Sequence, residues 1–219
     1  MSYNFSNHAQ PIVPPFPDSD DKLVLAEDCR RCPKLVESRE CISWGNGPLD
    51  ADVMVVGEAP GEGEPDVPQW QGGNWTGMSY TNRRSGQKIR HLLADAGYGH
   101  GDCFFSAAVR CHPAGNRDPT AAELDNCRPF LREEIETIAP RAVVTTGKHA
   151  TESVLAIEGE AIDGFLDAVL DPKRCPSLGV TVVPILHPSY QEVWIARLGY
   201  DRAEYVAEIR ETLSSVGGE

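Results

Sequence analysis

The sequence contains no long apolar run. None of its 219 residues belongs to a stretch of about 18 or more apolar residues, the length that a membrane helix needs. Residues 1–21 hold neither a basic nor an apolar segment, so no secretory signal is expected. We therefore expect a cytoplasmic protein with no membrane partner. At this length one core is the simplest organisation, and we expect a monomer.

Lysine is also scarce. The chain has five lysines, and its 20 basic residues face 33 acidic ones, which gives a formal net charge of -13 and a pI near 4.9. This balance argues against a broad DNA-binding surface, because phosphate contacts need a basic footprint. An acidic excess with few lysines is typical of halophilic proteins, in which molar salt screens charges beyond roughly 3 Å. DNA binding would therefore depend on a local basic strip or on high salt.

Three common site signatures are missing. The sequence has no GxSxG elbow, no P-loop and no GxGxxG turn. A zinc-stabilised hydrolase or a nucleotide-binding protein is therefore a poor interpretation.

The apolar pattern predicts alternating strands and helices. The expected strands are continuously apolar and cover residues 53–57, 103–109, 142–147 and 180–186. The expected helices cover residues 85–96, 120–138 and 148–156, and the second begins with a capping box, Thr120 to Glu123. This alternation predicts a three-layer αβα sandwich around a mostly parallel four-stranded sheet. We expect residues 1–20 to be a flexible arm and residues 21–219 to be a single domain.

Ligands of such sheets bind beyond the carboxyl ends of the strands. This rule directs attention to residues 57–61, 111–119 and 187–190, and to Gly147. The long polar segment 62–86, rich in glycine and aromatic residues, is a candidate functional loop.

Two polar side chains follow these strand ends. Glu58 lies in a glycine-rich turn, and His187 precedes Pro188, which stiffens the backbone. Either residue alone fits an ordinary turn with a solvated side chain. Because both follow strands of one sheet, we expect them to emerge at the same edge of that sheet.

Seven cysteines are many for a cytosolic chain, and the odd number argues against a closed disulfide framework. Cys29 and Cys32 form a C-x-x-C pair, while Cys111 and Cys127 bracket a turn-rich loop. Four such thiolates suit zinc or an iron-sulfur cluster, and their spacing does not choose between the two. Buried free thiols acting as small apolar side chains are the alternative.

Together these motifs resemble those of the uracil-DNA glycosylases, and most closely the thermophile-type family 4 of that superfamily. The resemblance covers about residues 28–210. It depends on the C-x-x-C pair, the GEAPG turn at residues 57–61, the block at residues 109–131 and the HPS motif at residues 187–189.

The resemblance implies a uracil-DNA glycosylase fold and a monofunctional enzyme that releases uracil from DNA and starts base excision repair. It assigns a [4Fe-4S] cluster to the four cysteines, Cys29, Cys32, Cys111 and Cys127. Cleavage of the glycosidic bond needs a donor to the departing base, a carboxylate and an aromatic platform. The implied catalytic residues are Glu58, Glu64 and His187. The implied substrate-binding residues are Ala59, Trp75, Asn116, Ser189, Arg83, Arg84, Ser85 and Arg117.

The chain departs from the family pattern at two places. Residues 74–77 read Asn-Trp-Thr-Gly where family 4 has Pro-Phe-Val-Gly, so Trp75 is the expected stacking ring. Ala107 stands where the family has an asparagine that reads uracil, and this strand resembles family 5. Loss of that amide favours a wider range of deaminated bases. A non-catalytic iron-sulfur protein that binds DNA is the alternative.

Overall fold

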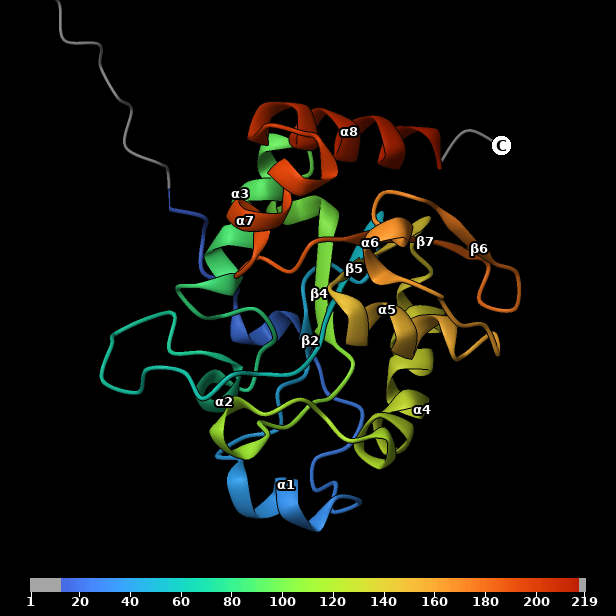
Figure 1. Cartoon of the computed structure of the whole chain (residues 1–219). Helices are drawn as coiled ribbons and strands as arrows, with labels where there is room; N and C mark the ends of the chain where they lie inside the picture. Colours follow the sequence, from blue (N-terminus) through green and yellow to red (C-terminus); the bar gives the residue numbers. More distant parts are fainter. Residues whose placement is uncertain (1–12, 217–219) are drawn as a thin grey trace, which may run out of the picture.

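The computed structural model describes residues 13–216, which form a seven-stranded sheet between two layers of helices (Figure 1). The strands are Lys22–Leu23 (β1), Gly45–Asn46 (β2), Val53–Gly57 (β3), Cys103–Ala107 (β4), Ala142–Thr146 (β5), Lys173–Cys175 (β6) and Val180–Ile185 (β7). The α-helices are Pro33–Ser38 (α1), Gly73–Thr76 (α2), Ser85–Asp95 (α3), Ala121–Ile138 (α4), Lys148–Leu155 (α5), Phe165–Ala168 (α6), Gln191–Trp194 (α7) and Arg202–Ser215 (α8). Short 3-10 turns cover Ser19–Asp21, His100–Asp102, Ala114–Asn116 and Ala196–Leu198.

The strand order is β1-β2-β4-β3-β5-β7-β6, and the four central strands, β4, β3, β5 and β7, are parallel. These four confirm the predicted parallel sheet. Strands β1, β2 and β6 add antiparallel edges that the sequence analysis missed. They have only two or three residues each, too few to produce an apolar pattern.

Both faces of the sheet are buried, as the continuously apolar strands predict. Val53 and Val55 of β3 face a core shared with α3 and α8, whereas Met54 and Val56 face a core shared with α4 and α5. This alternation produces the three layers seen in Figure 1.

The helix starts follow the capping signals. Thr120 accepts a hydrogen bond from the amide of Glu123, whose carboxylate accepts one from the amide of Thr120, so the predicted capping box is confirmed. Helices α3 and α5 also begin where the sequence predicts, and each ends one residue earlier than expected.

Most of the predicted arm, residues 1–12, lies outside the described residues. In its described part, the ring of Phe16 packs edge-on against Trp70 with 5.2 Å between the ring centroids. Across residues 13–216, no helix combines the length and apolar character needed to cross a bilayer.

Candidate active site and cysteine cluster

The ends of β3 and β7 bring Glu58 and His187 to the border of two cavities. One cavity has a volume of about 490 Å³ and is mainly polar, and the other, of about 590 Å³, is mainly apolar. Glu58, Asn116 and His187 line both cavities, so the two adjoin at these residues. Glu58 and His187 thus lie at one edge of the sheet, as the strand order requires.

His187 is held in a defined orientation. The amide of Ser189 donates a hydrogen bond to its Nδ1 at 3.2 Å, so the neutral ring carries its proton on Nε2. Burial lowers the pKa of His187, which favours this neutral form. Gly147, with φ of 94°, packs on the histidine, and a Cβ at Gly147 would lie 3.3 Å from that of His187. The site therefore presents a neutral N–H donor.

The carboxyl of Glu58 is half-buried. Burial raises its pKa above the ordinary value, the nearby His149 lowers it, and the nearby Asp118 raises it. Glu58 is therefore a stronger base than an exposed carboxylate, and its charge depends on two neighbours.

Those two neighbours were missed in the sequence analysis. Asp118 and His149 line the apolar cavity with Glu58, and His149 Nε2 lies 3.5 Å from Asp118 Oδ2. Both lie within or next to segments that follow strand ends, and this position was the one signal that could have found them. No motif selects these two side chains, because their meeting depends on how the loops fold.

Two arginines form the basic rim of the polar cavity. Arg83 and Arg84 are exposed and line it next to Ser85, at the first turn of α3. The side chain of Asn82 caps this turn by accepting hydrogen bonds from Gly86 N at 2.8 Å and Ser85 Oγ at 3.0 Å. A helix start flanked by guanidinium groups favours an anion such as phosphate.

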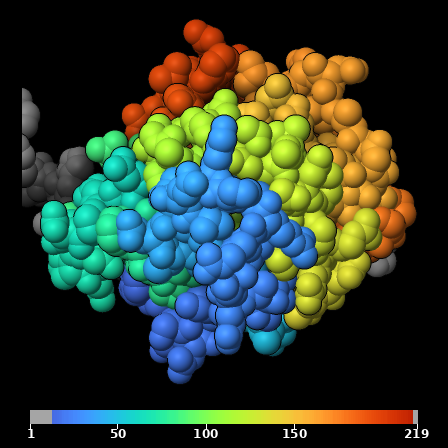
Figure 2. All heavy atoms as spheres, turned by 90° about the horizontal axis from the view of Figure 1, so that it is seen from below, coloured from blue at the N-terminus to red at the C-terminus, as the bar shows by residue number. Residues whose placement is uncertain are grey.

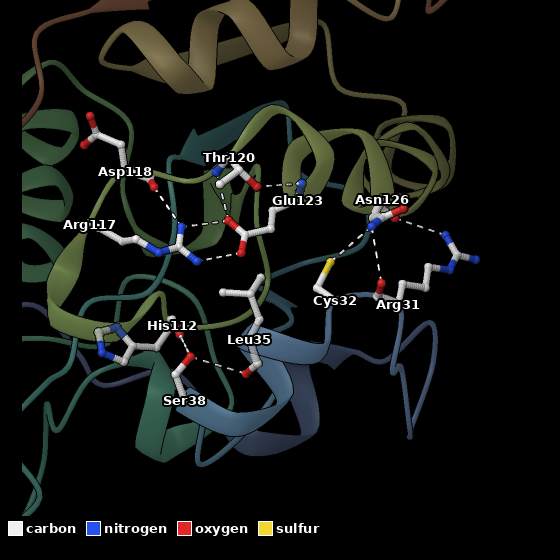
Figure 3. A network of polar contacts seen from close by, with 10 residues as sticks. All are labelled: Arg31, Cys32, Leu35, Ser38, His112, Arg117, Asp118, Thr120, Glu123 and Asn126. Atoms are coloured by element: carbon white, nitrogen blue, oxygen red, sulfur yellow. Dashed lines mark hydrogen bonds and ion pairs between the residues drawn. The ribbon is translucent and has the colours of Figure 1, made fainter.

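Other predicted residues also line the polar cavity, namely Ala59, Glu64, Asn116, Arg117 and Ser189. Asn116 braces the loop that follows β3 and begins with Glu58, here called the Glu58 loop. Its Oδ1 accepts a hydrogen bond from the amide of Glu62 in this loop at 2.8 Å. Arg117 donates to both carboxylate oxygens of Glu123, at 2.6 and 2.8 Å (Figure 3). Its guanidinium thus already has an anionic partner, whereas those of Arg83 and Arg84 have none within residues 13–216.

The aromatic residues are arranged differently from the expectation for Trp75. Trp75 is absent from the cavity lining, and its Nε1 donates to the carbonyl of Glu62 at 2.8 Å, which braces the Glu58 loop. Trp70 lines the polar cavity instead. Tyr80, also missed in the sequence analysis, packs beneath this loop, with its hydroxyl bonded to Thr146 and close to Gly57.

The four cysteines assigned by the resemblance line one small hollow between α1 and α4. Figure 2 shows the N-terminal segment, in blue, lying across the neighbouring yellow-green segment on this face. Asn126 joins the two segments by donating to Cys32 Sγ at 3.3 Å, and Arg31 donates to its carbonyl at 3.1 Å (Figure 3). Cys41, Cys103 and Cys175 do not line this hollow.

Two arginines, Arg39 and Arg110, lie beside these sulfurs. Arg39 donates to Cys111 Sγ at 3.0 Å. Arg110, 1 % exposed, pairs with Glu134 through Nη2 at 2.7 Å, yet its Nε and Nη1 lack any hydrogen-bond partner among the described residues. Burial raises the pKa of the Cys127 thiol to about 11, so without a ligand this thiol stays protonated. Unsatisfied donors beside four sulfurs fit an anionic group bound by thiolates.

Comparison with known proteins identifies the family. Residues 44–214 match the model of the uracil DNA glycosylase superfamily. The chain is 33 % identical to a type-5 uracil-DNA glycosylase of Pyrobaculum aerophilum, over 91 % of this chain and 93 % of that protein. It is 31 % identical to a type-4 uracil-DNA glycosylase of Thermotoga maritima, over 74 % and 77 % of the two chains. This chain belongs to the uracil-DNA glycosylase superfamily.

Proposed function

We propose that this protein is a monofunctional DNA glycosylase that hydrolyses the N-glycosidic bond of uracil in DNA and so starts base excision repair. The observation that carries the proposal is that Glu58 and His187 both lie on the border between two adjoining cavities and line both of them. Membership of the superfamily and the names of the relatives support the same reaction.

His187 would stabilise the departing base. Cleavage leaves the electron pair of the glycosidic bond on the base, and the negative charge spreads to its ring oxygens. A neutral imidazole with its proton on Nε2 can donate a hydrogen bond to such an oxygen without giving up the proton. The hydrogen bond from the Ser189 amide to Nδ1 keeps this donor oriented before the substrate arrives.

Glu58 would act on the other side of the bond. The sugar becomes cationic as the base leaves, and a nearby carboxylate stabilises this charge and accepts a proton from the attacking water. Glu58 suits this role because burial raises its pKa. Glu64 lines the same cavity but is exposed, so we assign it the secondary role of positioning water.

Arg83 and Arg84 would hold a DNA phosphate at the start of α3. Both line the polar cavity, and neither has an ion pair with another described residue. This placement provides the local basic strip that a chain of net charge -13 needs for DNA binding. Ser189 would contact the backbone beside the flipped nucleotide.

The four cysteines would hold a [4Fe-4S] cluster, as the resemblance implies. Among the described residues, no three cysteine sulfurs lie within 4.8 Å of one another, whereas a tetrahedral zinc site needs sulfur atoms about 3.8 Å apart. The wider spacing and the unsatisfied Arg110 donors favour a larger anionic group. The cluster would supply a rigid cross-link between α1 and α4.

This cross-link reaches the Glu58 loop through a chain of contacts. Ser38 of α1 donates to the carbonyl of His112 at 2.6 Å. The His112 ring in turn donates from Nδ1 to the carbonyl of Pro60 at 3.1 Å. Ordering of the cysteine segments therefore supports the loop that carries Glu58.

We propose that the enzyme removes other deaminated bases in addition to uracil. Ala107 ends β4 beside Gly57 and cannot provide the side-chain amide that the resemblance leads one to expect there. A site without that amide discriminates less between deaminated bases. We therefore propose hypoxanthine as a second substrate.

The test is abasic-site formation on labelled uracil oligonucleotides, single- and double-stranded, at low and molar salt. The parent protein should release uracil, and Glu58→Gln should release it much more slowly. Asp66→Asn is the matched control, because Asp66 is an exposed carboxyl of the same loop that does not line the polar cavity. No release of uracil by a cluster-containing protein at any salt concentration would refute the proposal.

The alternative, a non-catalytic iron-sulfur protein that binds DNA, predicts a different pattern. It expects tight binding of DNA with no abasic product from uracil or hypoxanthine. The cluster itself is tested separately by iron and sulfide content. Cys127→Ala should lose both, whereas Cys41→Ala should keep both, because Cys41 does not line the hollow.

A further inference from the structure

Asp118 and His149 have no role in the proposed chemistry, yet their side chains converge on Glu58. The three come from separate segments: Glu58 follows β3, Asp118 precedes α4, and His149 belongs to the first turn of α5. One polar atom from each lies within 4.8 Å of the other two. Two loops and one helix therefore bring three ionisable side chains together at the candidate catalytic carboxyl.

Asp118 is not neutralised by the nearest arginine. Its backbone carbonyl accepts a hydrogen bond from Arg117 at 2.9 Å, while its carboxylate points away from that guanidinium (Figure 3). The Arg117 side chain is instead bonded to both oxygens of Glu123. The Asp118 carboxylate lies 3.5 Å from the His149 ring.

Two basic side chains near Glu58, Arg117 and Lys148, are each paired with another carboxylate. On α5, Lys148 contacts Glu152 at 3.6 Å, and His149 Nδ1 lies 3.9 Å from the same carboxyl.

Arg83 and Arg84, at the start of α3, line the polar cavity with Glu58, but their charges are not among those that shift its pKa. Beyond β7, His187 favours its neutral form, because burial lowers its pKa. Beneath the Glu58 loop, Tyr80 is a phenol whose pKa is raised, first by burial and also by Glu58. Among the described residues, His149 is thus the group whose positive charge acts on Glu58, and it lies beside that carboxyl.

We propose that His149 and Asp118 are a positioning pair that sets the charge of Glu58, an inference that rests on the proposed role of Glu58. The His149 imidazolium holds Glu58 in its ionised form, and the Asp118 carboxylate holds the imidazole in place. The pair fixes the lowest pH at which the carboxylate can work.

The two members of the pair act on Glu58 in opposite directions. An imidazolium favours the ionised form of a neighbouring carboxyl, so its removal raises the pKa of Glu58. A second carboxylate opposes ionisation, so neutralising Asp118 lowers the pKa of Glu58. Because the ionised form is the active one, the rate falls as pH decreases through this pKa.

The experiment measures single-turnover uracil release against pH for the holoprotein and its variants. In the parent, the rate falls on the acid limb of the pH–rate profile, where Glu58 becomes protonated. His149→Gln should move this limb to higher pH by about one unit, so that at a pH below it the variant is roughly tenfold slower than the parent. Asp118→Asn should move the limb to lower pH. His149→Lys, which restores a cation, should return the limb toward that of the parent, and His91→Gln on α3 should leave it unchanged.

A purely structural role for the pair predicts a different result. Both variants would then lose rate equally at every pH, and the limb would stay in place. That result, or shifts of both variants in the same direction, would overturn the proposal.

Infrared titration of the Glu58 carboxyl, as the difference between each protein and its Glu58→Gln version, gives a readout that does not need activity. Opposite shifts in this titration support the pair even for a protein that releases no uracil. Parent activity unaffected by Glu58→Gln would instead refute the catalytic role of Glu58, and the infrared titration would still decide on the pair.

Discussion

The backbone amide of Ser189 and the Nδ1 atom of His187 are 3.2 Å apart and share a hydrogen bond. Because an amide N–H can only donate, Nδ1 must be the acceptor, and the ring proton of the neutral form is fixed on Nε2. Burial lowers the pKa of His187, which keeps the ring neutral as the pH falls toward the acid range. The histidine is therefore prepared as a donor and not as an acid.

His187→Ala is expected to slow uracil release by about 10² to 10³-fold, the usual effect of losing one donor to a developing anion. His187→Gln should retain more activity, because its side-chain amide can still donate. DNA affinity should change little in either variant, since the hydrogen bond strengthens as charge develops on the base. Single-turnover rates and anisotropy titrations separate the two effects. A loss of affinity as large as the loss of rate would contradict this role.

Glu123 is expected to make stability depend on pH. Its hydrogen bonds from Arg117, and then those from Thr120, lower its pKa from 4.5 to about 2. A carboxyl with a lowered pKa stabilises the fold above pH 4.5, and this contribution is lost as pH falls toward 2. Glu123→Gln should therefore lower the free energy of unfolding at pH 7 by about 1 to 2 kcal/mol.

Urea unfolding at pH 7 and pH 3 measures this contribution. The difference in free energy of unfolding between the parent and Glu123→Gln should shrink at pH 3, because Glu123 is then protonated in the unfolded chain and must lose that proton on folding. Glu133→Gln on the same helix is the control, since the Glu133 side chain is not buried. An equal difference in the free energy of unfolding at both pH values would show that the charge of Glu123 does not contribute and that the cap acts through its geometry alone.

Gly57 is expected to tolerate no side chain while Tyr80 is present. A Cβ at Gly57 would lie 2.6 Å from the Tyr80 hydroxyl oxygen, much closer than a non-bonded contact allows. Gly57→Ala should therefore lower the unfolding temperature, and adding Tyr80→Ala in the same chain should recover part of the loss. Gly101→Ala serves as control, because no atom lies within 4 Å of the position that its methyl group would take. Additive losses in the double variant would refute this steric explanation.

The part of the fold that follows from local pattern was predictable. The four continuously apolar strands and the capped helix at Thr120 have signals that repeat over many residues. Strands β1, β2 and β6 have no such signal, because two or three residues pair only when the sheet already provides an edge. Their formation is a tertiary effect that a sequence window cannot detect.

The candidate site was predictable to a similar extent. Strand order alone places Glu58 and His187 at one edge, so their meeting could be predicted from topology. The position of Trp75 could not, because its ring is hydrogen-bonded to the carbonyl of Glu62 and does not line the cavity. The approach of Asp118 and His149 likewise depends on loop conformations that no local motif specifies.

Arg83 and Arg84, the two arginines of the basic rim, should control how DNA binding depends on salt concentration. A phosphate contact releases condensed counterions, so losing one contact reduces the slope of log affinity against log salt by about 1. Arg84→Gln should show this reduction, because Arg84 lines the polar cavity at the start of α3. Arg202→Gln is the matched control, since Arg202 pairs with Asp95 at 2.7 Å and does not line that cavity. Equal slopes for all three proteins would place the phosphate contact elsewhere, and the acidic surface would then need high salt for any binding.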